Sequence, residues 1–388
     1  MAHRLISYGY ILIGNTMAHN VEKRAGLDVG SPEEPSPQSE PRDPTIVCGQ
    51  SRAARHANLV IFGLAVFMML AACVSLMLGR YPIEPAQAIG MLVNAIPGVN
   101  LEQTWTDQQA TLFFNVRLPR IILALIVGCS LATAGAAFQG TFQNPLVSPD
   151  ILGASQGAAF GAAVAILIGS GAFAVSMSAF GFSILTVMLV LLISSRAKGN
   201  RILITVLAGT MISSLFSAGV SFTKLVADPT DQLPAITYWL MGSLTGAKMS
   251  DIALAAIPMA IGMVILFVLR WRINILTMGD DEASTMGINA RRLRLFIIIA
   301  ATMATAASVA ISGMIGWVGL VVPHLCRMIV GSDYRKLIPA SMLFGASFLL
   351  VVDNIARLAS TAEIPIGILT AFVGAPFFLY LITRKKKV

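Results

Sequence analysis

The sequence predicts an all-α integral membrane protein with ten transmembrane helices. Of its 388 residues, 56% are apolar and only 12% are charged, which leaves too little polar surface for soluble domains of that size. Long apolar runs recur along the chain, and about 20 such residues cross the ~30 Å hydrocarbon core of a bilayer. A weak similarity between two halves of the chain suggests an internal repeat.

Ten runs with few or no charges are each expected to cross the membrane, which makes residues 57–388 the transmembrane domain. The eighth run is short and is interrupted by glycines. The runs fall near residues 58–79, 119–140, 150–170, 174–194, 203–225, 252–270, 294–313, 315–330, 337–356 and 365–383.

Residues 1–56 differ in kind and are predicted to be a disordered polar tail. Within them, residues 31–44 hold five prolines and four acids, which cannot bury enough apolar surface to offset the entropy of ordering. The apolar run at residues 5–14 is too short to span a bilayer, and no cleavage site follows it. We therefore expect no signal peptide, and Met17 is a possible alternative start.

Arginines and lysines set the expected orientation, because cytoplasmic loops retain them. If the basic residues 384–387 lie inside, ten crossings place both termini in the cytoplasm. The net charge of +8 is then a topology signal, and nucleic acid is not an expected partner. The expected outside set is small and consists of Arg80, Arg117, Arg120, Lys224, Lys248 and Arg357.

The second and seventh runs begin alike, at residues 117–122 and 292–297. Both continue to a Leu-Val-x-Pro sequence, at residues 146–149 and 320–323. Five crossings separate the copies, so helices 2–5 and 7–10 would form an inverted repeat. Transporters that alternate access around a midplane path are often built in this way.

Small residues recur every fourth position in two runs. One set predicts close helix packing: Gly153, Gly157 and Gly161. The other, mostly hydroxyl-bearing, either packs on a neighbour or lines a wet path, and Lys224 at its outer end favours the path: Thr205, Gly209, Ser213, Ser217 and Ser221.

Glycines and a proline predict a broken helix at residues 313–324. His324 and Cys326 follow, but two ligands without a third make a poor metal site, so a histidine satisfied by hydrogen bonds is the favoured interpretation. Asp353 and Arg357 lie one helical turn apart and are expected to form a structural ion pair.

A long charged loop at residues 270–294 contains Gly-Asp-Asp-Glu from Gly279. A short helix is expected from Asp280 to Ala290, because acids in a first turn favour the helix dipole. Such a segment is either a solvated loop or a surface for a soluble partner.

No phosphate-binding loop and no hydrolase motif occurs in the sequence. Ion-coupled transport usually needs ionisable groups at mid-membrane, and only Asp353 comes near. Energy is therefore expected from a partner, although an ion-coupled secondary transporter and a membrane-embedded enzyme remain alternatives.

Several blocks together resemble the FecCD family, the permeases of ABC importers for iron-siderophore, haem and vitamin B12. They occur in the family's order over about residues 58–385. The blocks are residues 117–120, 143–146, 150–153, 238–242, 279–287, 319–324, 353–357 and 363–367.

The resemblance implies a type II ABC importer permease of the cytoplasmic membrane that carries a ferric siderophore, or alternatively cobalamin or haem, without cofactor or metal. It implies a second copy, two cytoplasmic ATPase subunits, an extracytoplasmic substrate-binding protein, and a path lined by the hydroxyl-bearing stripe. The ATPase-docking residues it implies are Gly279, Asp280, Asp281, Glu282, Met286 and Gly287. The resemblance also implies that three arginines face acidic residues of the binding protein: Arg117, Arg120 and Arg357.

Two features depart from the family pattern. The polar tail of residues 1–56 is not part of it. Residues 196–200, Arg-Ala-Lys-Gly-Asn, do not match the small hydroxyl gate that the family places before the fifth helix, so the inner gate cannot be assigned by resemblance.

Overall fold

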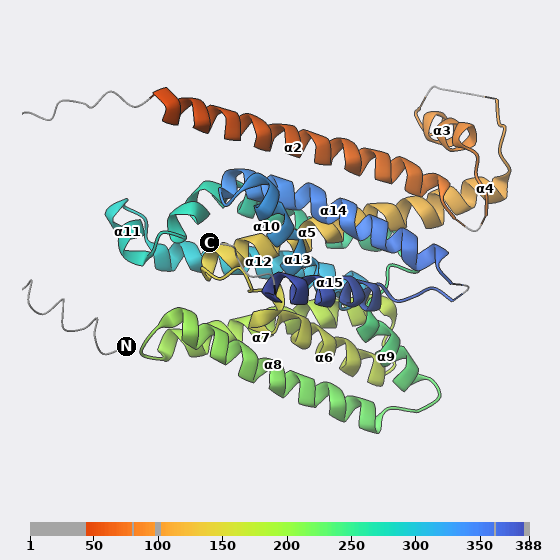
Figure 1. Cartoon of the computed structure of the whole chain (residues 1–388). Coiled ribbons are helices and arrows are strands. Elements are labelled where there is room, and N and C mark those ends of the chain that lie inside the picture. The colour runs from red at the N-terminus through yellow and green to blue at the C-terminus, as the bar shows by residue number, and fades with distance from the viewer. Residues whose placement is uncertain (1–43, 80, 98–101, 361, 384–388) are drawn as a thin grey trace, which may run out of the picture. The chain divides into compact units, whose positions relative to one another are not determined.

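The computed structural model describes residues 44–79, 81–97, 102–360 and 362–383, and these are helical with connecting loops and no strand (Figure 1). The compact unit spans Arg52–Val388, and Met1–Ser51 is a separate unit. The larger helices are α2 (Pro44–Met77), α5 (Leu118–Thr141), α6 (Ala154–Leu167), α7 (Ala172–Arg196), α8 (Arg201–Val226), α10 (Met249–Leu276), α12 (Ala290–Ser312), α13 (Val318–Val330), α14 (Tyr334–Leu358) and α15 (Ile366–Thr383).

Shorter elements lie between them. They are α3 (Pro85–Asn94), α4 (Asp107–Leu112), the π-helical turn η1 (Phe113–Arg117), the 3-10 turn η2 (Pro149–Leu152), α9 (Gln232–Met241) and α11 (Asp280–Thr285).

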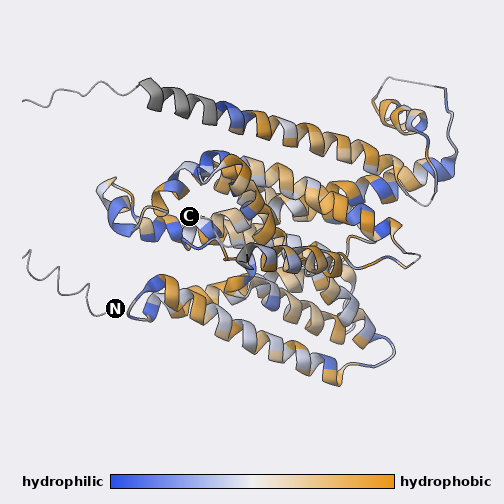
Figure 2. Ribbon diagram, viewed as in Figure 1, coloured by the Kyte–Doolittle hydropathy of each residue, from blue (hydrophilic) through white to orange (hydrophobic). Residues whose placement is uncertain are grey.

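Each of the ten predicted runs overlaps one of the larger helices. Seven helical segments among the described residues are long and apolar enough to span a membrane, and α6, α13 and α15 are shorter apolar helices. Figure 2 shows the apolar residues spread along the length of these helices. The count of ten crossings stays a prediction.

The domain boundary predicted at residue 56 stays a prediction, and α2 begins before it, at Pro44. Proline is tolerated in the first turn of a helix, and no further proline occurs before Pro82. The predictions for residues 1–43, Met17 included, and for the basic residues 384–387 fall outside the described residues. Sequence analysis also did not predict α3 and α9.

Helix α5 is the centre of the bundle and packs on α10, α12, α13 and α14. Its closest crossings use glycines, because a Cβ on Gly128 would collide with the backbone of Gly345 and one on Gly135 with that of Gly319. Backbones approach closely in this way where lipid provides no hydrophobic drive between helices.

The predicted glycine seam is confirmed. A Cβ on Gly157 would meet the Phe182 carbonyl at 2.7 Å, and one on Gly161 would meet the Ser178 carbonyl at 2.6 Å. Both neighbours belong to α7, so the seam holds α6 against α7.

The candidate transport pocket and two charged ends

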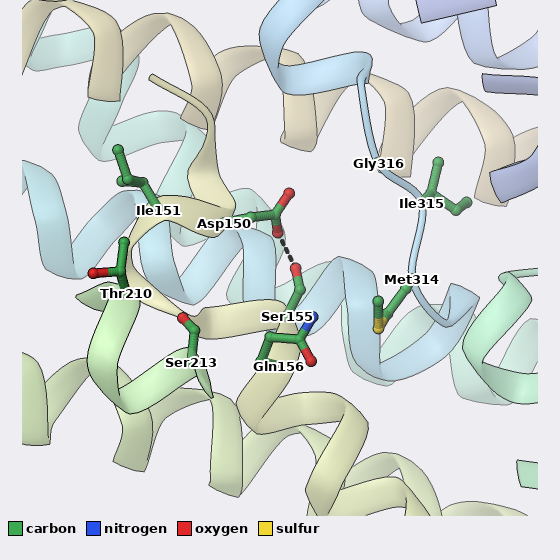
Figure 3. A pocket seen from close by; sticks show the side chains of 9 residues that line it. All are labelled: Asp150, Ile151, Ser155, Gln156, Thr210, Ser213, Met314, Ile315 and Gly316. Carbon is green, nitrogen blue, oxygen red and sulfur yellow. Dashed lines mark hydrogen bonds between the residues drawn. The ribbon is translucent and has the colours of Figure 1, made fainter. Parts of the chain in front are cut away.

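A pocket of about 410 Å³ opens where three non-adjacent parts of the chain meet (Figure 3). One wall is η2 with the first turn of α6, another is the middle of α8, and the third is the link between α12 and α13. The lining residues are Asp150, Ile151, Ser155, Gln156, Thr210, Ser213, Met314, Ile315 and Gly316.

Helix lengths predict that this pocket lies within the membrane. Helix α6 has 14 residues and α13 has 13, so each is about 20 Å long at 1.5 Å per residue. Each is therefore shorter than a ~30 Å hydrocarbon core. The segments that precede α6 and α13 line the pocket. We therefore expect non-helical backbone at membrane depth. Such backbone is tolerated only where it is buried in protein or lines a cavity.

The broken helix predicted at residues 313–324 is confirmed in its first part, since α12 ends at Ser312 and α13 begins at Val318, but α13 continues through Pro323. Gly313 and Trp317, at the two ends of the link, have φ values of +66° and +69°. A non-glycine residue rarely adopts a positive φ, so the surrounding packing fixes this turn. At the end of α12, the Ser312 carbonyl accepts a hydrogen bond from outside the helix, from the Ser243 N–H at 2.8 Å.

The hydroxyl-bearing stripe on α8 divides into three parts. Thr205 is buried and lies 2.5 Å from the hydroxyl of Ser194, and Gly209 packs against the Ile151 carbonyl. Ser213 lines the pocket, whereas Ser217 and Ser221 are exposed beyond it. The lining of a complete path by this stripe stays a prediction.

Two pocket residues were not singled out from the sequence. Asp150 belongs to η2, is solvent-accessible in the pocket, and accepts a hydrogen bond from the Ser155 hydroxyl (Figure 3). Gln156 is half-buried, and its amide makes no hydrogen bond with any described residue. A carboxylate at this depth is a candidate functional group.

The charged loop forms the short helix α11, which is anchored at its first residue. Arg294 of α12 is buried and donates to both carboxylate oxygens of Asp280, at 2.7 and 3.1 Å. Its Nε also donates to the Thr141 carbonyl at the end of α5, at 3.3 Å. The hydrogen bonds from Arg294 to Asp280 are the main reason that the pKa of Asp280 lies below its usual value.

The predicted helix from Asp280 to Ala290 is too long, because α11 ends at Thr285. Gly287 has a φ of +73°, and this left-handed conformation ends a helix. Asn289 then begins α12 by accepting from the Arg292 N–H at 3.0 Å. The side chains of Asp281, Glu282 and Met286 are exposed.

A buried ionic network lies at the other end of α5. Arg120 is 5% exposed and pairs with Asp353 and with Glu363, each at 2.8 Å. Glu363 also accepts from the Thr245 hydroxyl at 2.6 Å. Arg120 precedes Thr141 by 21 positions of one helix, or about 30 Å, so this network and α11 occupy opposite ends of the bundle.

The ion pair predicted between Asp353 and Arg357 is confirmed, at 3.2 Å, although the two atoms are not aligned as a hydrogen bond. Arg357 also donates to Ser75 of α2 at 2.9 Å. Arg117 is 3% exposed and donates to the backbone carbonyls of Leu76 and Met77, at 2.8 and 3.2 Å.

The three arginines predicted to dock a binding protein are therefore engaged within the chain. Their docking role stays a prediction.

The interpretation of His324 as a satisfied histidine stays a prediction. Its Nδ1 is buried and has no hydrogen-bond partner among the described residues. It follows Pro323 inside α13, and sequence spacing does not reveal which neighbours a helix face meets.

Comparison with known families identifies the chain. The sequence model of the FecCD transport family matches residues 46–384. The chain belongs to this family. It is therefore a permease of an ABC importer and a multi-pass membrane protein, as its apolar helices indicate.

Two curated relatives show the range of the family. The chain is 41% identical over 328 residues to the molybdate import system permease protein MolB of Haemophilus influenzae, covering 84% of this chain and 96% of the relative. It is 40% identical over 277 residues to an iron chelatin transport system permease of Helicobacter pylori, covering 71% and 84%.

A solved structure supports the fold of this FecCD permease. It is described as an inward-facing conformation of a metal-chelate type ABC transporter and superposes with a TM-score of 0.75 at 39% identity. The match covers 84% of this chain and 99% of the other.

Proposed function

We propose that this FecCD permease carries a ferric siderophore across the cytoplasmic membrane and is driven by ATP hydrolysis on two separate cytoplasmic subunits. The observation that carries the proposal is α11. Asp280 fixes the short helix to the bundle, while Asp281, Glu282 and Met286 remain exposed to a partner.

The contacts of α11 suggest how force would reach the pocket. Arg294 joins α11 to α12 and, through the Thr141 carbonyl, to α5. The chain continues from Thr141 into η2, and the far end of α12 continues into the link at residues 313–317. Because both segments line the pocket, a pull on α11 by a closing ATPase would move two of its walls.

The exposed faces of α8 and α15 support a homodimer around a central path. Met211, Leu215 and Phe222 of α8 and Phe372 of α15 are large apolar side chains with more than 60% exposure. Met314 and Gly316 line the pocket beside α8 and also a second pocket beside α15. The two helices therefore flank one segment, and a second copy seated there would enclose the pocket.

An inverted repeat of helices 2–5 and 7–10 fits the packing. In this numbering the first helices of the two copies are α5 and α12, and the third are α7 and α14. Helix α5 packs on α14, and α12 packs on α7, so each first helix meets the third helix of the other copy.

Binding-protein docking at the ionic network would require a change of partners. Arg120 and Arg357 already face Asp353 and Glu363. Acidic residues of an extracytoplasmic binding protein would therefore compete with the half-buried Glu363, whose side chain is 33% exposed. In this arrangement both chain termini lie in the cytoplasm, with α11.

The names of the Helicobacter relative and of the solved structure favour a metal chelate as cargo. Cobalamin or haem is the alternative cargo for the same machine. The test is purification with the partner ATPase and binding protein, followed by ATPase assays with each ligand. Uptake that continues without the ATPase and follows an ion gradient would instead establish a secondary transporter.

A further inference from the structure

Two hydroxyl groups of α8 present hydrogen-bond acceptors to the pocket. The Ser213 hydroxyl donates to the Gly209 carbonyl at 2.7 Å, and the Thr210 hydroxyl donates to the Leu207 carbonyl at 2.9 Å. Each hydroxyl has therefore used its one proton within α8 and offers only lone pairs to the pocket. Figure 3 shows Thr210, Ser213 and Asp150 around the same space.

Asp150 adds a carboxyl group, and no basic side chain is among the described residues that line this pocket. The Ser155 hydroxyl donates to one of its oxygens. Asp150 also lies just before the first turn of α6, a 14-residue helix, where the helix dipole favours negative charge. An incoming anion would find the position beside this helix already occupied by a carboxylate.

We propose that Asp150 is a charge-selecting residue of the translocation path, which favours neutral or cationic metal chelates with N–H or O–H donors and disfavours oxyanions such as molybdate. The proposal rests on the proposed function, because it takes the pocket to be part of the path. The free amide of Gln156 can donate or accept and complements the carboxylate for a neutral guest.

Thiol labelling measures the charge preference of the pocket without the cargo or the ATPase. The full chain carries Ser213→Cys, and the exposed Cys73 and Cys48 are replaced by serine. The probes are the trimethylammonium-ethyl and sulfonato-ethyl methanethiosulfonates, one cationic and one anionic. Labelling of the same chain without Ser213→Cys gives the background from Cys129 and Cys326.

Adding Asp150→Asn should lower the ratio of the cationic to the anionic labelling rate by about tenfold, because a nearby charge acts on the two probes with opposite sign. Asp251→Asn, an exposed acid outside this pocket, should leave the ratio unchanged. So should Asp150→Asn when the thiol is placed by Ser221→Cys, since Ser221 is eight residues or about 12 Å farther along α8.

An unchanged ratio at position 213 overturns the assignment of charge selection to Asp150. Failure of both probes to react there, while the thiol at position 221 is labelled, overturns the assignment of the pocket to a wet path. Stimulation of the complete importer by molybdate would also contradict the proposal. Labelling needs only the permease, so these failures are separable from a loss of ATPase coupling, which would sink the proposed function.

Discussion

The charged side chains near the two ends of α5 differ in how far they are paired within the chain. At one end, Arg294 uses one acid of α11 and leaves Asp281 and Glu282 exposed. At the other end, Arg120 and Arg357 are already matched by Asp353 and Glu363. The exposed acids at the first end can bind a partner directly, whereas the arginines at the second end must first lose ion pairs within the chain.

The largest effect is expected from breaking the buried network. Asp353→Asn leaves two guanidinium groups without their shared carboxylate, and removal of one partner from a buried ion pair costs about 3–5 kcal/mol. Denaturant titration of the permease in detergent measures the loss. Asp333→Asn, at a partly exposed pair with Arg335, should cost less than about 1 kcal/mol, and equal losses would contradict the contrast.

At the α11 end, the anchor can be removed without altering the exposed acids. Arg294→Gln should lower ligand-stimulated ATPase activity by about tenfold or more, the effect of losing ~1.4 kcal/mol of coupling, because α11 would no longer hold to α5 and α12. Arg292→Gln is the matched control, since Arg292 is exposed two positions away on the same helix. Similar activities in the two variants would refute the anchor.

The exposed acids of α11 are tested by charge reversal. Asp281→Lys with Glu282→Lys should abolish ATPase coupling while the protein still reaches the membrane, because lost helix-dipole interactions are worth only about 0.3–1 kcal/mol each. The neutral pair Asp281→Asn with Glu282→Gln separates charge from shape. Normal uptake by the charge-reversed variant would show that Asp281 and Glu282 do not contribute to ATPase docking.

The smallest effect is expected at Glu363. Glu363→Gln removes the competing carboxylate from Arg120, so capture of the binding protein should tighten by a few-fold at low salt and less at high salt. Surface plasmon resonance with immobilised permease provides the measurement. Weaker capture would mean that Glu363 itself contacts the binding protein.

Sequence reasoning found every apolar run that became a larger helix, because apolar length is a local property. It could not see that Arg120 meets Asp353 and Glu363, which follow it by 233 and 243 positions. It also assigned no role to Asp150, the first residue of the predicted run at residues 150–170, because only the fold brings this residue beside Ser213. The end of α11 was missed because Gly287 adopts a left-handed conformation that the loop sequence alone does not require.

The central claim is that α11 couples this permease to a separate ATPase that is driven by a loaded binding protein. The direct measurement is ATPase activity of the reconstituted complex with binding protein that is empty or loaded with a ferric siderophore, haem, cobalamin or molybdate. We predict stimulation by the ferric siderophore, and its loss when Arg294→Gln is present. Activity that is indifferent to every loaded binding protein, or uptake that persists without the ATPase, would contradict the account.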